Sequence, residues 1–99
     1  MSAELKLSDF KSELGVYWNE RETDSKIDRY IAEGKSALCN YAGVDNIKFN
    51  SGSVEGSLLM AYVNYAWNKQ SEYFEENYKS NLINLRLKYQ GEAYAEKEN

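Results

Sequence analysis

Apolar residues between positions 23 and 43 recur with the spacing of a single helical stripe. The stripe begins at Ile27 and continues at offsets of 3, 4, 7, 11 and 14 residues, namely Tyr30, Ile31, Gly34, Leu38 and Tyr41. Since this spacing gathers side chains on one face of an α-helix, we predict an amphipathic helix here. Thr23 or Asp24 is expected to cap its start, and Gly43 is expected to end it.

The next patterned segment, from about Ser53 to Gln70, is apolar on almost every face. Its central stretch reads LLMAYVNYAW, and only a thin polar stripe interrupts it, formed by Ser57, Asn64, Asn68 and Ser71. A helix of this kind lies at the centre of a bundle or is covered by a partner. We therefore predict that it packs against the amphipathic helix before it.

A further stripe begins near Ser71 and consists of Phe74, Tyr78, Leu82, Leu85 and Tyr89. Its spacing favours a helix. The stretch INLRLKY also alternates in the manner of a strand, so a strand over residues 83–89 stays open. Gly91 is expected to interrupt the helix, and residues 90–99 are expected to form a flexible, charged tail.

The N-terminal part of the chain is predicted to hold a shorter helix, from about Ser8 to Leu14. Ser8 is its expected N-cap, and Gly15 suits the position just past its end. Three apolar residues then follow as a cluster that must pack on something: Val16, Tyr17 and Trp18.

Residues 44–52 are rich in turn-forming residues and are predicted to be a loop. Within it, residues 46–50 alternate between apolar and polar, so a short strand is possible. Taken together, the patterns predict an all-α fold, a small compact bundle of about four helices. We expect one helical domain spanning residues 1–99, with the flexible tail at its end.

Composition agrees with a folded globular protein, since 42% of residues are hydrophobic and 28% are charged. The net charge of −4 argues against a protein that grips duplex DNA, because such binding depends on neutralising phosphates. Aromatic residues make up 14% of the chain, and tyrosine suits half-buried positions and interfaces. We interpret one aromatic cluster as core: Tyr62, Tyr65, Trp67, Tyr73, Phe74 and Tyr78.

The chain offers little for catalysis or metal binding. It has one cysteine, Cys39, and no histidine, so the common zinc ligands and the common activating base for a nucleophile are scarce. The acidic pairs Glu20/Glu22 and Glu75/Glu76 are expected on solvated faces. We predict no catalytic residues, no metal site, no cofactor and no enzymatic activity.

Two features bear on the compartment. A lone cysteine predicts a reducing environment, and the N-terminal sequence MSAELKLSDF lacks the apolar run of a signal peptide. The longest apolar run, Leu58 to Val63, is far shorter than the ~20 residues of a membrane span. We therefore expect an intracellular protein that does not enter a membrane.

The C-terminal segment carries apolar residues away from its main stripe, at positions Ile83, Leu87 and Tyr94. A chain of 99 residues has a modest core, and large exposed apolar patches are uncommon on monomers. We therefore predict an inter-subunit or partner-binding surface formed by Ile83, Leu87, Tyr89 and Tyr94. The same segment is expected to be loose until it is bound.

The two central helical segments resemble the small head–tail connector proteins of long-tailed bacteriophages and their prophages, also called head-completion or adaptor proteins. The matching residues are ETDSKIDRYIAEGKSALCNYAG and, after the polar loop, LLMAYVNYAWNKQSEYFEENYKSNLINLRL. The resemblance covers roughly residues 8 to 87. Its most telling parts are the acidic start of the first segment, the YAG ending at residues 41–43, and the run from Tyr65 to Leu87.

The resemblance implies a structural virion-assembly protein with a small α-helical fold, no enzymatic activity and no cofactor. Such proteins form a ring, typically a dodecamer, between the capsid portal and the tail. The ring extends the DNA channel and completes the head after packaging. The implied location is therefore the head–tail junction of the virion, and the host cytoplasm during assembly.

The implied partners are the portal protein, a stopper or tail-completion protein, and further copies of the same chain. DNA is implied only as cargo that passes through the channel, and no membrane is involved. The C-terminal segment is expected to contact the portal.

Two other classes stay open on the sequence. One is a cytosolic helical adaptor or regulatory protein that binds one protein partner through its aromatic surface. The other is a helix-turn-helix DNA binder, which needs a polar or basic recognition helix. The segment from Ser53 to Gln70 is too apolar for that role, and the net charge has the wrong sign.

Overall fold

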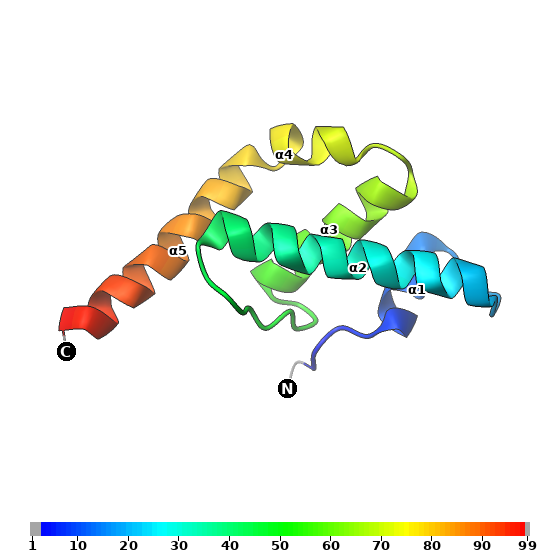
Figure 1. The fold of residues 1–99 in the computed structure, drawn as a ribbon, viewed down its shortest axis with the longest axis horizontal. Coiled ribbons are helices and arrows are strands. Elements are labelled where there is room, and N and C mark those ends of the chain that lie inside the picture. Colours follow the sequence, from blue (N-terminus) through cyan, green and yellow to red (C-terminus); the bar gives the residue numbers. More distant parts are fainter. Residues whose placement is uncertain (1–2, 99) are drawn as a thin grey trace.

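Helices make up nearly all the regular structure in the computed structural model, which describes residues 3–98, with side chains from residue 3 to residue 91 (Figure 1). Their order is α1 (Leu7–Leu14), α2 (Arg21–Ala42), α3 (Val54–Trp67), the 3₁₀ helix η1 (Ser71–Tyr73), α4 (Phe74–Asn77) and α5 (Lys79–Glu98). The prediction of an all-α bundle is confirmed. Within residues 3–98 the one strand-like feature is an antiparallel bridge between Glu4 and Asn50.

α2 and α3 form the centre of the fold. Figure 1 shows α2 running along the molecule, with α3 crossing it and α5 lying across the region of its C-terminal end. The approach of α2 to α3 depends on Gly34, because a methyl group there would lie 2.7 Å from Leu59 Cδ1 and 2.8 Å from Tyr62 Cδ1. The prediction that these two helices pack against each other is confirmed.

The buried side chains of the described residues form one hydrophobic cluster to which α1, α2, α3, α4 and α5 all contribute. The largest fully buried members are Phe10, Ile27, Leu38, Phe49, Leu59, Val63, Phe74 and Leu85. Most of the aromatic cluster predicted for the core lies at one edge of it, but the prediction is wrong for Tyr73, which is 50% exposed. Phe74 is the buried centre of the aromatic cluster, with the rings of Tyr62, Tyr65 and Tyr78 packed around it at centroid distances of 5.2, 6.0 and 5.0 Å.

The helix ends are partly as predicted. Gly15 and Gly43 follow α1 and α2 in the left-handed conformation, with φ of 75° and 74°, as expected. The predicted N-caps are wrong. α1 begins at Leu7 rather than after Ser8, because the Asp9 carboxylate accepts a hydrogen bond from the Lys6 amide at 2.8 Å.

α2 likewise begins before the predicted caps. Its first residue is Arg21 and its N-cap is Glu20, which accepts a hydrogen bond from the Thr23 hydroxyl at 2.7 Å. Asp24 pairs instead with Lys11 of α1 at 2.9 Å. The two predicted caps therefore have other partners, Glu20 for Thr23 and Lys11 for Asp24. α2 begins before both of them, at Arg21.

The loop between α2 and α3 is extended and pairs with the N-terminal segment. The Leu5 amide donates to the Phe49 carbonyl at 2.9 Å, and the Ser51 amide donates to the Ala3 carbonyl at 2.8 Å. Ile47 and Phe49 are buried on one side. The alternation over residues 46–50 therefore marks an extended, half-buried segment, but the pairing stops at a single bridge.

The region after Ser71 is divided into η1, α4 and α5, and its predicted stripe faces the core. Phe74, Leu82 and Leu85 are between 2% and 5% exposed. Residues 83–89 are helical, and α5 continues through Gly91 to Glu98. The expected interruption at Gly91 is thus wrong, because one glycine costs a helix only about 1 kcal/mol. The flexibility of residues 90–99 stays a prediction, and Asn99 lies outside the described residues.

Candidate partner-binding surface

The side of α5 that faces away from the core carries two large apolar side chains. Ile83 is 50% exposed and Leu87 is 60% exposed, whereas Leu82 and Leu85 beside them are buried. Residues four apart lie on one face of a helix, so Ile83 and Leu87 are neighbours. We call this pair the outer face of α5.

The structure groups only part of the predicted site. Ile83 and Leu87 share the outer face, as predicted. Tyr89 belongs to the inner stripe, where it is half-buried against the core, and the Lys88 ammonium lies 5.6 Å from its ring centroid. Tyr94 follows Leu87 by seven residues in α5, but its side chain lies outside the described residues.

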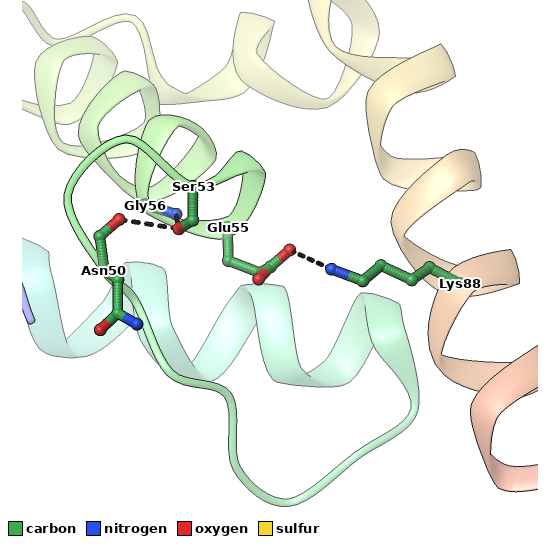
Figure 2. Close-up of polar contacts among 5 residues, drawn as sticks. All are labelled: Asn50, Ser53, Glu55, Gly56 and Lys88. Carbon is green, nitrogen blue, oxygen red and sulfur yellow. Dashed lines mark hydrogen bonds and ion pairs between the residues drawn. The ribbon is translucent and has the colours of Figure 1, made fainter. Parts of the chain in front are cut away.

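α5 is tied to the rest of the molecule by an ion pair. Lys88 Nζ lies 2.9 Å from Glu55 Oε1 near the start of α3 (Figure 2). Glu55 is only 8% exposed, so its carboxylate depends on this partner. Sequence reasoning missed the pair, because 33 residues separate its members and no local pattern connects them.

The start of α3 holds Glu55 in a fixed position. The Ser53 hydroxyl donates to the Asn50 carbonyl at 2.7 Å and accepts from the Gly56 amide at 2.9 Å (Figure 2). A side chain on Gly56 would collide with the Asn50 carbonyl. The turn into α3 therefore requires glycine at this position, and the ordered turn presents Glu55 to α5.

A hollow next to the outer face lies between α5, α4 and the C-terminal part of α2, with a volume of about 260 Å³. We call it the α2–α5 groove. The residues that line it include Tyr41, Glu75, Lys79, Leu82, Ile83 and Arg86. Burial, and secondarily the Glu75 carboxylate beside it, raises the pKa of the Tyr41 hydroxyl. The groove thus combines an apolar lining with two cations and one carboxylate.

A second exposed apolar feature lies in the connection between α1 and α2. Tyr17 is 86% exposed and Trp18 is 50% exposed. We call this pair the aromatic tip. The prediction that Val16, Tyr17 and Trp18 all pack is wrong for two of them, because Val16 alone is buried, at 4% exposure.

The remaining chemistry of the surface is sparse. Among the side chains that the structure describes, from residue 3 to residue 91, there is no group of acidic, cysteine or histidine residues that could bind a metal ion. Burial raises the pKa of the Cys39 thiol, which favours the protonated thiol over the more reactive thiolate. None of the helices over the described range has the length and apolar character needed to cross a membrane.

Comparison with known proteins adds nothing to this picture, because no family model, no curated protein and no solved structure matches the chain. The candidate surface therefore rests on geometry alone: an exposed apolar helix face, a groove beside it, and an ion pair that holds the helix in place. Such an arrangement suits the binding of another protein.

Proposed function

We propose that this protein is a structural virion-assembly protein, a head–tail connector that forms a ring between the capsid portal and the phage tail. In this role it extends the DNA channel and completes the head after packaging. The observation that carries the proposal is the outer face of α5, where Ile83 and Leu87 are 50% and 60% exposed. The resemblance of the two central segments to connector proteins supplies the class of partner.

The outer face suits the contact with the portal for a physical reason. Ile83 and Leu87 are not members of the core cluster, to which the inner stripe of the same helix contributes Leu82 and Leu85. An apolar pair on a helix can enter a groove of another protein by presenting side chains at positions i and i+4. The Glu55–Lys88 ion pair holds that part of α5 against α3, which limits the ordering that binding requires.

The charge of the chain also fits the proposal. DNA in a connector channel must pass without being gripped, and a net charge of −4 gives little general attraction for phosphates. DNA is therefore proposed only as passing cargo. The partners are the portal protein, a stopper or tail-completion protein, and further copies of this chain.

The decisive experiment compares two single variants in an assembly assay with portal-bearing, DNA-filled heads. Leu87→Ser removes half of the outer face, and Val54→Ser is the matched control, since Val54 is also 60% exposed but lies at the start of α3. Both should fold, as far-ultraviolet circular dichroism would show. The Leu87 variant should fail to join the heads, which would leak DNA and accept no tails. Normal infectious particles from that variant would contradict the proposal.

A truncation after Tyr89 and the double variant Leu87→Ser/Tyr94→Ser extend the test to the end of α5. Both should fold and both should fail to dock. A complementary pull-down from a prophage-induced lysate should recover a portal protein. Recovery of one unrelated cytosolic protein through the same face would indicate the alternative, a cytosolic helical adaptor that binds one partner.

A further inference from the structure

The aromatic tip and the α2–α5 groove lie at opposite ends of α2. The tip directly precedes the helix, and the groove contains Tyr41 from its last turn. α2 has 22 residues, which corresponds to about 33 Å at 1.5 Å per residue. Figure 1 shows the α1–α2 connection at one end of the molecule and the meeting of α2 with α5 toward the other. The two features of one chain cannot reach each other.

The aromatic tip is exposed but held in place. The Val16 amide donates to the Lys11 carbonyl at 2.8 Å, and Val16 itself is buried. On the other side, Lys11 Nζ binds both Asn19 Oδ1 at 3.0 Å and Asp24 Oδ1 at 2.9 Å. Bonds on both sides of Tyr17 and Trp18 therefore fix the backbone that carries them. A backbone that is already ordered reduces the entropy that is lost when the two rings bind.

The α2–α5 groove has apolar surface that could receive the two aromatic rings. Leu82, Ile83 and Tyr41 supply apolar surface, and aromatic side chains that enter apolar pockets are typical anchors of protein interfaces. Charges on the two features are complementary. Lys79 and Arg86 outnumber Glu75 in the groove, whereas the first three charged residues after the tip are Glu20, Arg21 and Glu22, two of which are acidic.

We propose that copies of this chain associate head to tail, with Tyr17 and Trp18 of one copy seated in the α2–α5 groove of the next. Because the two surfaces differ and lie at opposite ends, the contact is heterologous and can repeat from copy to copy. This contact rests on the geometry alone, whereas its closure into a ring rests on the proposed function.

Each contact is small. An aromatic side chain buries at most about 150–250 Å², so two of them cover well under the ~800 Å² per partner of a standard interface. Association in solution is therefore weak and dependent on concentration. It becomes stable when several contacts close a ring or when the portal gathers the copies, because effective concentration then rises.

The test is a complementation experiment by sedimentation velocity at protein concentrations from about 20 μM to about 2 mM, the range that suits a weak contact. The tip variant is Tyr17→Ala/Trp18→Ala and the groove variant is Ile83→Asp. The wild-type mass should rise with concentration, and each variant alone should stay monomeric. An equimolar mixture should form a species of two copies and grow no further, because it has one intact tip and one intact groove to join.

The control for the groove variant is Val54→Asp, which adds the same charge at an apolar side chain that is also exposed and should assemble like the wild type. A wild type that stays monomeric throughout overturns the proposal, and so does a mixture that stays monomeric. Leu87→Ser separates this proposal from the portal contact, since Leu87 does not line the groove. This variant should assemble normally and fail only to dock. If the wild-type protein self-associates normally but does not bind the portal, the proposed function alone is contradicted.

Discussion

α3 and α5 both carry apolar side chains on more than one face, but neighbouring elements cover them to different extents. An apolar helix face is stable when another helix or a partner covers it. α3 packs against α1, α2, η1 and α4, and six of its 14 residues are buried. α5 packs mainly against α2 and α4, and its outer face stays exposed at Ile83 and Leu87.

The difference in burial between α3 and α5 comes from the elements around them rather than from the apolar content of the helices themselves. Apolar periodicity indicates which faces of a helix are to be buried, but the residues that bury them can belong to the same chain or to another. α3 is enclosed because four elements pack against it, α1 and α2 from before it in the chain and η1 and α4 from after it. α5 contacts α2 and α4, and these contacts leave Ile83 and Leu87 50% and 60% exposed. The outer face of α5 is therefore the surface that we propose as the partner-binding site.

The largest expected effect is at the centre of α3. Leu59 is fully buried, at 0% exposure, and Leu59→Ala should lower the free energy of unfolding by about 2–5 kcal/mol, because it leaves a cavity in the core. Urea denaturation followed by circular dichroism measures this loss. A change below about 1 kcal/mol would mean that α3 is less enclosed than the comparison requires.

A smaller effect is expected where α2 crosses α3. Gly34→Ala should destabilise the protein by about 1–2 kcal/mol, since the clash with Leu59 and Tyr62 exceeds the gain in helix propensity. The matched control is Gly91→Ala in α5, where a methyl group meets nothing within 4 Å. That variant should be neutral or slightly stabilising. If both substitutions changed the free energy of unfolding equally, the contrast between the enclosed α3 and the open α5 would not hold.

The sequence predicted the features that depend on near neighbours. The stripe of α2, the stripe from Phe74 to Tyr89 and the terminal glycines Gly15 and Gly43 all follow from spacing within a few turns. The predicted N-caps were wrong by a few residues. Several polar residues near a helix start can accept hydrogen bonds from its free backbone amides, and contacts with other parts of the chain determine which residue becomes the N-cap. At the start of α2, the pairing of Asp24 with Lys11 is such a contact.

Features made by distant segments could not be predicted in this way. The exposure of Tyr17 and Trp18, the Glu55–Lys88 pair and the α2–α5 groove all depend on how helices cross. Periodicity fixes which face of a helix is apolar but not which helix lies against it. Of the candidate site, the sequence therefore found the pair Ile83 and Leu87, placed Tyr89 with them although it faces the core, and missed the groove.

The ion pair between α3 and α5 should contribute modestly. Glu55→Gln is expected to cost about 0.5–1 kcal/mol, since Lys88 is half exposed and its charge is screened by water. A double-mutant cycle with Lys88→Met measures the coupling between the two side chains. The coupling should shrink at high salt. A coupling of zero would show that α5 is held by its inner stripe alone.

Alkaline pH should weaken the fold through two tyrosines. Burial is the main cause that raises the pKa of Tyr41 and Tyr62 above the ordinary 10.0, and Glu75 and Glu33 add to it respectively. The folded state then holds these protons more tightly than the unfolded chain. The stabilisation is fully present below about pH 10 and is lost as pH rises through the higher folded-state pKa. Tyr41→Phe should flatten this decline in urea titrations, and a decline as steep as that of the wild type would contradict the prediction.

The smallest effect on stability is expected at the outer face of α5. Leu87 is 60% exposed, and Leu87→Ser should change the free energy of unfolding by no more than about 0.5 kcal/mol, as substitutions at exposed positions usually do. The paired measurement is Leu85→Ser two residues earlier, where the side chain is 2% exposed and a buried hydroxyl should cost several-fold more. If both variants lose similar stability, Leu87 belongs to the core and the outer face is not free for a partner. If only Leu85→Ser is destabilised, while Leu87→Ser folds normally and no longer joins portal-bearing heads, then one helix stabilises the fold with one face and binds its partner with the other.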